Sequence, residues 1–312
     1  MQSVSLLFLI IGLCLIVFGA DSLVDGASSI ARRFRVSEFV IGLTIVGFGT
    51  SCPELVVSLT GAIAGNADIS VGNVVGSNIF NTLCIIGLTT LVSPIAVSVK
   101  NRKVDLPMVI CTTLVTIALG LTAGRLNRIE GVILLLLFAV YMVYCFRSQS
   151  GDALESGDIR QRKLPVAILF TVAGLAGLII GGDLFVKSAM DIARKLGVSD
   201  KFIAITLLAG GTSLPELATC IAAAVRKKNQ LAFGNIIGSN IFNLLLILGS
   251  ASVITPLSFA ALNVVDLSVL IGSTVLLLLF AYTGKKASVN RVEGSALFAL
   301  FVGYYIYLFL KP

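Results

Sequence analysis

The sequence contains no histidine, and charged residues make up only 12% of its 312 residues. The lack of histidine excludes histidine-based acid–base catalysis and histidine ligation of metals. Low charge combined with 57% hydrophobic residues excludes a soluble globular enzyme, since soluble proteins average about 25% charged residues. The sequence also lacks a GxxxxGK[ST] loop, so nothing predicts ATP binding or hydrolysis. These absences leave a membrane protein as the predicted class.

Long apolar runs predict an all-α polytopic membrane protein. A spanning helix needs roughly 20 mainly apolar residues. The runs are continuous rather than alternating, which excludes a β-barrel porin. Pro94 and Pro256 are placed at the exits of two runs that are longer than one span. Ten transmembrane helices are expected, at 3–27, 38–65, 69–93, 106–124, 129–147, 164–187, 201–225, 230–254, 266–283 and 293–310.

Basic residues predict the orientation of these spans. Of the 23 Lys and Arg residues, 16 fall in the loops that follow odd-numbered spans. Because cytoplasmic loops carry an excess of Lys and Arg, these loops are expected in the cytoplasm and both termini outside. The net charge of +7 then reflects topology rather than a surface for nucleic acid. The expected location is the plasma (inner) membrane.

The sequence repeats itself after 162 residues. GTSCPEL at 49–55 returns as GTSLPEL at 211–217, and GNVVGSNIFN at 72–81 returns as GNIIGSNIFN at 234–243. Each half has five spans, an odd number, so the second half enters the membrane inverted, as in secondary transporters. The expected organisation is a first five-helix repeat at 1–147 with its motifs at 47–81, a cytoplasmic linker at 148–163, and a second, inverted repeat at 164–312 with its motifs at 209–243.

Glu54 and Glu216 are the most informative residues, because each lies within an otherwise apolar span. A carboxylate at membrane depth is costly and is tolerated when it faces a cation, a proton or water. A protonated structural Glu is a weaker explanation for two equivalent positions. Gly, Thr, Ser and Pro next to each Glu weaken the helix, so backbone carbonyls are expected to line a cavity there.

Neutral oxygens around the two carboxylates complete the predicted site. The hydroxyls of Thr50, Ser51, Thr212 and Ser213 are adjacent in sequence, and Ser77 with Asn81, like Ser239 with Asn243, lies four residues apart on one helix face. An all-oxygen set suits Ca²⁺, Na⁺, Mg²⁺ or Mn²⁺. Six to eight oxygens favour Ca²⁺ over octahedral Mg²⁺.

Other polar and small residues in the motifs are assigned structural roles. Asn78 and Asn240 are expected to form hydrogen bonds between helices. The pairs Gly72/Gly76 and Gly234/Gly238 are expected to let helices approach closely. Asp21 and Asp183, also equivalent in the repeat, are expected to anchor helix ends.

The paired motifs GTSCPEL with GNVVGSNIFN and GTSLPEL with GNIIGSNIFN resemble the two α-repeats of the cation/Ca²⁺ exchanger superfamily, and most closely its prokaryotic sodium/calcium exchangers. The resemblance implies antiport by alternating access, with Ca²⁺ and Na⁺ as transported ions and no organic cofactor. It implies that the helices of spans one and six slide against the other eight. Calcium efflux driven by sodium entry is the expected direction.

The resemblance also implies roles for individual residues. The Ca²⁺ ligands would be Glu54, Glu216, Thr50 and Thr212. The flanking Na⁺ sites would use Ser51, Ser77, Ser213 and Ser239 with the carbonyls of Gly47 and Ala209. Asn81 and Asn243 would line the middle site.

One residue departs from the exchangers that this sequence resembles, which often carry Asp at the position of Asn243. With Asn in both halves, the maximum fixed charge of the site is −2. One Ca²⁺ neutralises it, three Na⁺ leave +1, and two protons also neutralise it. Because an amide at 243 can stand in for a protonated Asp, exchange of Na⁺ for Ca²⁺ stays favoured, with exchange of H⁺ for Ca²⁺ or another divalent cation as the alternative.

Two other classes are less consistent with these residues. A cation channel could share an acidic pore, but inverted repeats with weakened helices indicate a carrier. An intramembrane protease would need a Ser–His pair or an aspartate dyad, which this sequence does not supply. The expected partners are therefore inorganic cations and the lipid bilayer, with no nucleic acid, no ATP and a monomeric chain.

Overall fold

The computed structural model describes residues 2–65, 67–122, 124–147, 162–196, 209–259, 262–283 and 288–310. Its first half, to residue 147, consists of helices, short π-helical segments (η) and two-residue strands. Their bounds are α1 (Gln2–Phe34), α2 (Glu38–Ile41), η1 (Gly42–Val46), α3 (Gly47–Thr50), α4 (Cys52–Ile63), α5 (Ala67–Ile79), η2 (Phe80–Ile85), α6 (Ile86–Val92), β1 (Ile95–Ala96), η3 (Asn101–Asp105), α7 (Leu106–Thr122), β2 (Arg125–Leu126) and α8 (Arg128–Arg147).

The second half repeats this order. Its elements are α9 (Leu164–Lys195), α11 (Ala209–Gly211), α12 (Leu214–Val225), α13 (Asn229–Ile241), η5 (Phe242–Ile247), α14 (Leu248–Ile254), β3 (Leu257–Ser258), α15 (Val264–Thr283), β4 (Ser288–Val289) and α16 (Arg291–Leu310). The expected linker at 148–163 lies outside the described residues except for its last two positions.

Within the described residues the helices account for nine of the ten expected spans, and they differ from the expectation in three respects. Eight described helices are long and apolar enough to cross a membrane, and Glu38–Thr50 with Cys52–Ile63 forms one further span bent by 46°. The expected span 201–225 is described only from residue 209 onward. Helices α1 and α9 continue well past the expected ends at 27 and 187. The exits at Pro94 and Pro256 are confirmed, since α6 and α14 end two residues before them.

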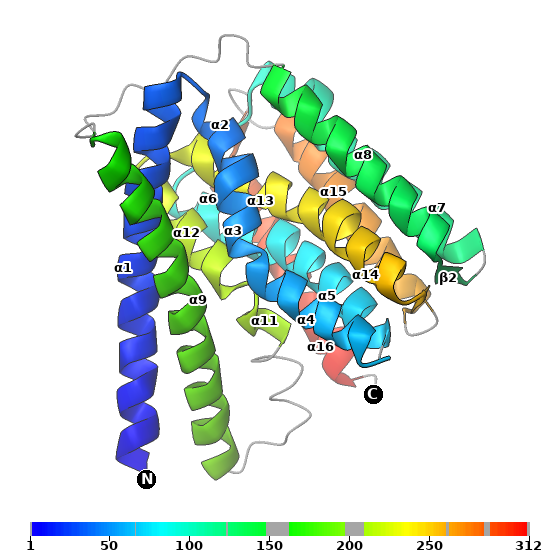
Figure 1. The fold of residues 1–312 in the computed structure, drawn as a ribbon, viewed down its shortest axis with the longest axis horizontal. Coiled ribbons are helices and arrows are strands. Elements are labelled where there is room, and N and C mark those ends of the chain that lie inside the picture. Colours follow the sequence, from blue (N-terminus) through cyan, green and yellow to red (C-terminus); the bar gives the residue numbers. More distant parts are fainter. Residues whose placement is uncertain are drawn as a thin grey trace.

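Helices α1 and α9 form a long antiparallel pair beside the other helices (Figure 1). Glycines allow the close approach: a Cβ added at Gly12 would lie 2.8 Å from the carbonyl oxygen of Gly181, and one at Gly19 would lie 2.9 Å from that of Gly174. Shifting Gly12 and Gly19 by 162 residues gives Gly174 and Gly181. The Gly12–Gly181 contact therefore corresponds to the Gly19–Gly174 contact when the two repeats are exchanged, as expected for a pseudo-two-fold axis.

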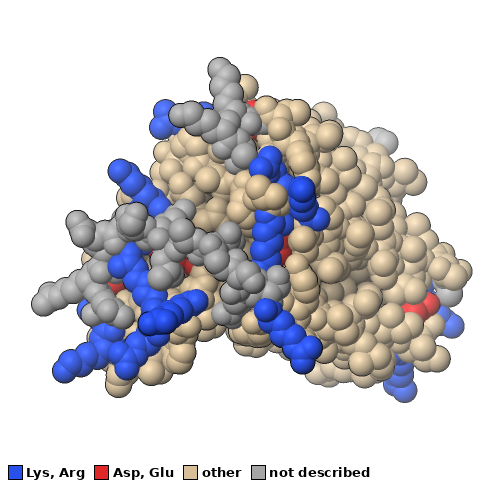
Figure 2. Space-filling view, turned by 90° about the horizontal axis from the view of Figure 1, so that it is seen from above, with Lys and Arg blue, Asp and Glu red and all other residues tan. Residues whose placement is uncertain are grey.

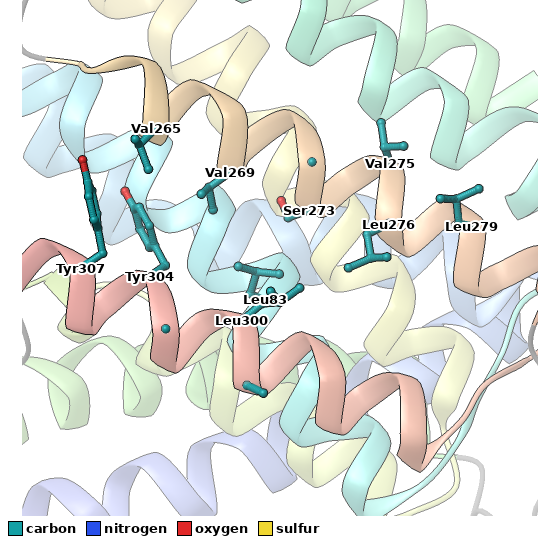
Figure 3. A pocket seen from close by; sticks show the side chains of 13 residues that line it. Leu83, Val265, Val269, Ser273, Val275, Leu276, Leu279, Leu300, Tyr304 and Tyr307 are labelled. Carbon is teal, nitrogen blue, oxygen red and sulfur yellow. The ribbon is translucent and has the colours of Figure 1, made fainter.

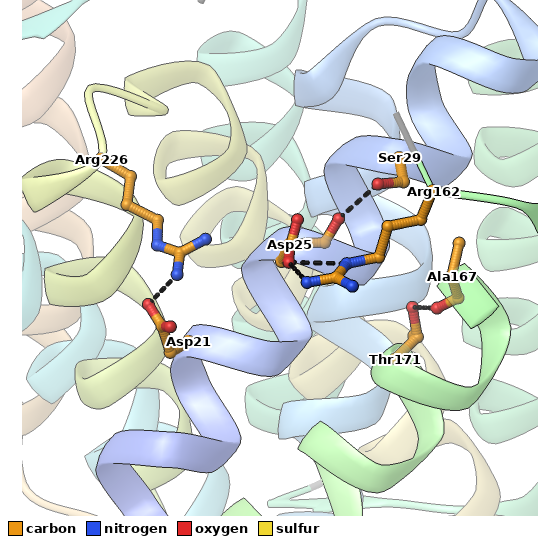
Figure 4. A network of polar contacts seen from close by, with 7 residues as sticks. All are labelled: Asp21, Asp25, Ser29, Arg162, Ala167, Thr171 and Arg226. Carbon is orange, nitrogen blue, oxygen red and sulfur yellow. Dashed lines mark hydrogen bonds and ion pairs between the residues drawn. The ribbon is translucent and has the colours of Figure 1, made fainter. Parts of the chain in front are cut away.

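Asp21 and Asp183 do not anchor helix ends, so that prediction was wrong. Both lie in helix interiors, because α1 and α9 run longer than their most apolar stretches suggested. Asp21 forms an ion pair with Arg226 at the end of α12, which Figure 4 shows. Asp183 instead pairs with Lys187 on its own helix, at 2.8 Å.

A second ion pair joins the beginning of α9 to α1. Asp25 Oδ2 accepts hydrogen bonds from Arg162 Nε at 2.8 Å and Nη2 at 2.5 Å (Figure 4). The Arg162 guanidinium also lies 3.8 Å from the ring centroid of Phe170. This pair links α1 to the segment just before α9, whereas Asp21–Arg226 connects α1 to α12.

The centre of the protein is formed by α5–η2–α6 and α13–η5–α14, whose residues are mostly buried. The expected close approach through glycine is confirmed in the second repeat. A Cβ at Gly234 would lie 2.1 Å from the Phe39 carbonyl and one at Gly238 would lie 2.2 Å from the Leu43 carbonyl, so this helix packs its backbone directly against α2 and η1. The positions equivalent to Phe39 and Leu43, 201 and 205, lie outside the described residues, and the close approach at Gly72 and Gly76 stays a prediction.

Two short antiparallel strand pairs tie loops of opposite repeats together. Strand β1 pairs with β4 through Ile95 and Val289, and β2 pairs with β3 through Leu126 and Leu257. These apolar residues are fully buried. Each pair therefore connects the two repeats at a loop end and does not contribute to the spanning core.

An apolar groove of about 560 Å³ lies between α15 and α16, with Leu83 of η2 at its base (Figure 3). Gly272 and Gly303 both line it, and a Cβ added at either would have no atom of the described residues within 4 Å. At the equivalent position of the first repeat, 162 residues before Gly303, Tyr141 is buried. The two repeats thus differ in how they fill this outer region.

Lys and Arg side chains gather over one end of the helices (Figure 2). At this end α1 finishes with Arg32 and Arg33, and α9 begins after Lys163. Both termini lie toward the opposite end (Figure 1). This asymmetry is the structural counterpart of the basic loops counted in the sequence.

Candidate functional site

The site is built at a break in the second span of each repeat. Ser51 separates α3 from α4, and Pro53 sits in the first turn of α4. Ser213 and Pro215 have the same places before and within α12. Proline is well suited to a first helical turn because its missing N–H would have no partner there. The sequence-based expectation of a weakened helix at these two positions is confirmed.

Each break places a glutamate in the first turn of the following helix, Glu54 in α4 and Glu216 in α12. Each is only 1% exposed. The first-turn N–H groups of a helix favour negative charge nearby, which helps to hold a carboxylate at this depth. The helix break therefore both positions each glutamate and helps to stabilise its negative charge.

The two carboxylates are linked by serines of the opposite repeat. Ser51 Oγ donates to Glu216 Oε1 at 2.9 Å, and Ser213 Oγ donates to Glu54 Oε1 at 3.1 Å. These bonds are equivalent under the 162-residue shift. The structure thus brings the two GTS-x-PEL motifs together around a single centre, where the pseudo-two-fold axis passes.

A second pair of serines reaches the same oxygens from α5 and α13. Ser77 Oγ contacts Glu54 Oε1 at 3.5 Å, and Ser239 Oγ contacts Glu216 Oε1 at 3.4 Å. These are long hydrogen bonds. Ser239 Oγ also lies 3.4 Å from the carbonyl oxygen of Gly47, so one predicted backbone ligand lies at the site.

Four buried oxygens of the site accept no hydrogen bond from any described residue. They are Glu54 Oε2, Glu216 Oε2, Asn81 Oδ1 and Asn243 Oδ1. Buried polar atoms are normally paired, and each exception requires a reason. With the two glutamates ionised, all four can only accept, so a cation is the partner that fits them, and hard oxygen donors suit Na⁺ or Ca²⁺.

The two threonines differ in their contacts. Thr50 Oγ1 donates to Asn235 Oδ1 at 3.1 Å, which leaves its lone pairs available to a cation. Thr212 Oγ1 is buried with no hydrogen-bond partner within the described ranges. Ala209 begins α11 at the edge of the described residues, and its predicted carbonyl ligand stays a prediction.

Two asparagines near the site, Asn73 and Asn235, were not predicted as site residues from the sequence. Asn73 Nδ2 donates to the backbone oxygen of Glu54 at 3.2 Å and to Ser58 Oγ at 3.0 Å. Its equivalent, Asn235, accepts from Thr50 and donates to Cys220 Sγ at 3.3 Å. Both stand in the repeated G-N-x-x-G-S-N motif, so the repeat itself was the available signal. They support the site and its helices.

Two grooves related by the repeat flank the site. One, of about 420 Å³, lies between α9 and α4 and is lined by residues that include Cys52, Val186 and Thr212. The other, of about 530 Å³, lies between α1 and α12 and is lined by Asp21, Leu214 and Arg226 among others. In the described part of the chain, only the first groove includes a predicted site residue, Thr212.

Comparison with known proteins assigns the chain to a family. The sequence profile described as sodium/calcium exchanger protein matches twice, at residues 4–147 and 166–310. A relative named CaxA in Alkalimonas amylolytica is 42% identical, over 98% of this chain and 99% of its own length. The sodium/calcium exchanger MaX1 of Methanosarcina acetivorans is 33% identical, over 99% of both chains.

A solved structure agrees with the fold. The sodium-calcium exchanger NCX_Mj superposes with a TM-score of 0.87 at 34% identity, covering 99% of this chain and 100% of the other. The ten-span, two-repeat architecture expected from the sequence is confirmed. The protein is a membrane transporter rather than an enzyme, and its chain belongs to the sodium/calcium exchanger family.

Proposed function

We propose that the protein exchanges Na⁺ for Ca²⁺ by alternating access at the site between the two repeats. The observation that carries this proposal is the set of four unpaired acceptor oxygens on Glu54, Glu216, Asn81 and Asn243. Two carboxylates and two amides form a hard, all-oxygen environment, and the hydroxyls around them can complete a Ca²⁺ shell of six to eight ligands.

Charge balance predicts how exchange with sodium would appear in an assay. Two ionised glutamates give the site −2, which one Ca²⁺ neutralises. Replacing that Ca²⁺ with three Na⁺ leaves +1, so exchange at this ratio moves net charge across the membrane. Thr50 and Thr212 would join the two glutamates around Ca²⁺. The flanking Na⁺ ions would be held by Ser51, Ser77, Ser213 and Ser239 with the carbonyls of Gly47 and Ala209.

The proposed orientation has the basic end of Figure 2 in the cytoplasm and both termini outside the plasma membrane. The groove between α4 and α9, which includes Thr212, would then open to the outside. Sodium entering down its gradient would drive Ca²⁺ out, with a single chain as the transporting unit. The proposed boundaries of the repeats, 1–147 and 164–312, follow the same division.

One residue supports a second candidate. Asn243 replaces the Asp that is common in sodium/calcium exchangers, which leaves the glutamate pair as the only charged groups of the site motifs. Two protons on Glu54 and Glu216 would balance one Ca²⁺ without net charge movement. Exchange of H⁺ for Ca²⁺ is therefore the alternative that the experiment must separate.

The test is uptake of ⁴⁵Ca²⁺ into proteoliposomes loaded with Na⁺, with K⁺, or with only a pH gradient. Three results together support the proposal. Uptake needs internal Na⁺, it increases when the membrane potential is made positive inside because net positive charge leaves the liposome, and it disappears in Glu54→Gln and Glu216→Gln. Glu293→Gln is the matched control, because Glu293 caps α16 by accepting from Asn290 N. Uptake driven by the pH gradient and indifferent to Na⁺ would overturn sodium coupling in favour of protons.

A further inference from the structure

Four asparagines form a buried cluster that crosses the two repeats. Asn78 of α5, Asn81 of η2, Asn240 of α13 and Asn243 of η5 are each at most 2% exposed. Asn81 Nδ2 donates to Asn240 Oδ1 at 3.2 Å, and Asn243 Nδ2 donates to Asn78 Oδ1 at 2.9 Å. Each amide that faces the cation site is therefore held by an asparagine of the other repeat.

The orientation of Asn78 follows from its backbone partner. Asn78 Nδ2 donates to the main-chain carbonyl oxygen of Asn240 at 3.1 Å. A carbonyl oxygen only accepts, and its two lone pairs allow this bond beside a helix bond. Turning the Asn78 amide over would place two oxygens against each other, so its Nδ2 must face the carbonyl and its Oδ1 must face Asn243.

Asn243 is then oriented in turn. Because Asn78 presents an oxygen, Asn243 must present its Nδ2, and its own Oδ1 is turned to the other side. That Oδ1 is one of the four acceptors that no described residue pairs. A free Asn243 amide could equally turn its N–H groups toward the site, where they would repel a cation.

The first repeat has a weaker anchor for the equivalent amide. Asn240 Nδ2 donates to Thr82 Oγ1 at 3.0 Å, and a hydroxyl can rotate to donate or to accept. The repeat equivalent of Thr82 is the apolar Leu244. Only the Asn243 side is therefore fixed by a group that cannot change its hydrogen-bonding role.

We propose that Asn78 is a positioning residue that fixes the Asn243 amide, so that its oxygen faces the transported cation as an uncharged ligand. A carboxylate at position 243 would set one of its oxygens against Asn78 Oδ1. Asn78 thus favours an amide at 243 and keeps the charge of the site at that of the two glutamates. This inference rests on the proposed function, since it requires a cation between the repeats.

The test is a double-mutant cycle on Ca²⁺ binding to the full chain in detergent. Titration with CaCl₂ in Na⁺-free buffer would give the dissociation constants of wild type, Asn78→Ala, Asn243→Ala and the double variant. Loss of an orienting hydrogen bond is expected to weaken Ca²⁺ binding about 2- to 10-fold in Asn78→Ala. In the Asn243→Ala background the same change is expected to alter binding by less than about twofold.

Matched variants separate positioning from structural damage. Asn101→Ala removes another fully buried amide, one bonded to Ser98 and Gln230, and is expected to leave Ca²⁺ binding unchanged. Thermal unfolding in the same detergent identifies a misfolded variant. If Asn78→Ala does not fold, Asn78→Ser, which is smaller and keeps a polar group, takes its place in the cycle.

Two outcomes would overturn the assignment in different ways. Normal wild-type binding with the same loss from Asn78→Ala in both backgrounds would show that Asn78 does not act through Asn243, while leaving the proposed function intact. A wild-type protein that binds no Ca²⁺ would overturn the proposed function together with this inference.

Discussion

The ion pair between Asp21 and Arg226 is expected to bias the transport cycle. It joins α1 to the end of α12 across the groove that includes no predicted site residue. Opening that groove requires α1 to move away from α12, which breaks the pair. Among the described residues the equivalent groove has no corresponding ion pair, because Ala64 stands at the position equivalent to Arg226 and Asp183 pairs within α9.

The size of the effect follows from exposure. The Asp21 side chain is 52% exposed and that of Arg226 is 31% exposed, and such pairs contribute about 0.2–1 kcal/mol. Replacing Asp21 with Asn should therefore raise the population open at this groove about 1.4- to 5-fold, since 1.4 kcal/mol corresponds to a factor of ten. Higher ionic strength should reduce the difference, because salt screens exposed pairs.

Cysteine labelling measures this population. Cys52 lines one groove and its repeat equivalent, Leu214, lines the other. In a protein carrying Cys52→Ala and Leu214→Cys, the initial rate of modification by a hydrophilic thiol reagent is proportional to the fraction open beside α12. Asp21→Asn should raise that rate by the stated factor. Cys52→Ala alone gives the background from the remaining cysteines.

Asp25→Asn is the matched control. It breaks the pair with Arg162, which lies before α9 and stays with α1, so the labelling rate should not change. An unchanged rate in Asp21→Asn, or an equal rise in Asp25→Asn, would refute the reasoning that the pair across the groove biases the cycle.

Two further substitutions test how the helices are held together. The buried side chains of Lys228 and Glu38, each 3% exposed, form an ion pair at 2.6 Å. Lys228→Met leaves Glu38 without this partner and should lower the unfolding free energy by about 3–5 kcal/mol, as measured by chemical denaturation in micelles. Adding Glu38→Met should restore most of the loss. Gly181→Ala places a Cβ 2.8 Å from the Gly12 carbonyl and should destabilise by about 1–3 kcal/mol. A Cβ at Gly182 would have no atom of the described residues within 4 Å, so Gly182→Ala should lose less stability than Gly181→Ala in thermal unfolding. Equal stability of both glycine variants would contradict direct α1–α9 contact.

Local sequence patterns were sufficient to predict most of the spans and the helix breaks beside the two glutamates. Apolar runs set the length of a spanning helix, and the Gly-Thr-Ser-x-Pro-Glu pattern weakens a helix wherever it occurs. The 162-residue repeat then required that matching motifs meet at one centre. These features depend on neighbours along the chain, which is why they could be predicted without a structure.

Pairings across space could not be predicted in the same way. The motif does not say that Ser51 binds Glu216 rather than Glu54, or that Asp21 meets Arg226 while Asp183 meets Lys187. Nor does it say that Gly234 packs against Phe39. Each choice depends on which helix lies opposite in the folded protein.

The sequence by itself determined that the chain is a duplicated membrane protein with two buried carboxylates in weakened helices, because apolar length, charge and repetition act locally. Only the tertiary structure decided which oxygens remain unpaired and therefore available to a cation. Asn243 illustrates the difference: its identity is a matter of sequence, but its orientation depends on a carbonyl of α13 and an amide of α5. The main-chain carbonyl can only accept a hydrogen bond, so it fixes the direction of the bonds that follow from it, and folding alone brings it next to Asn78.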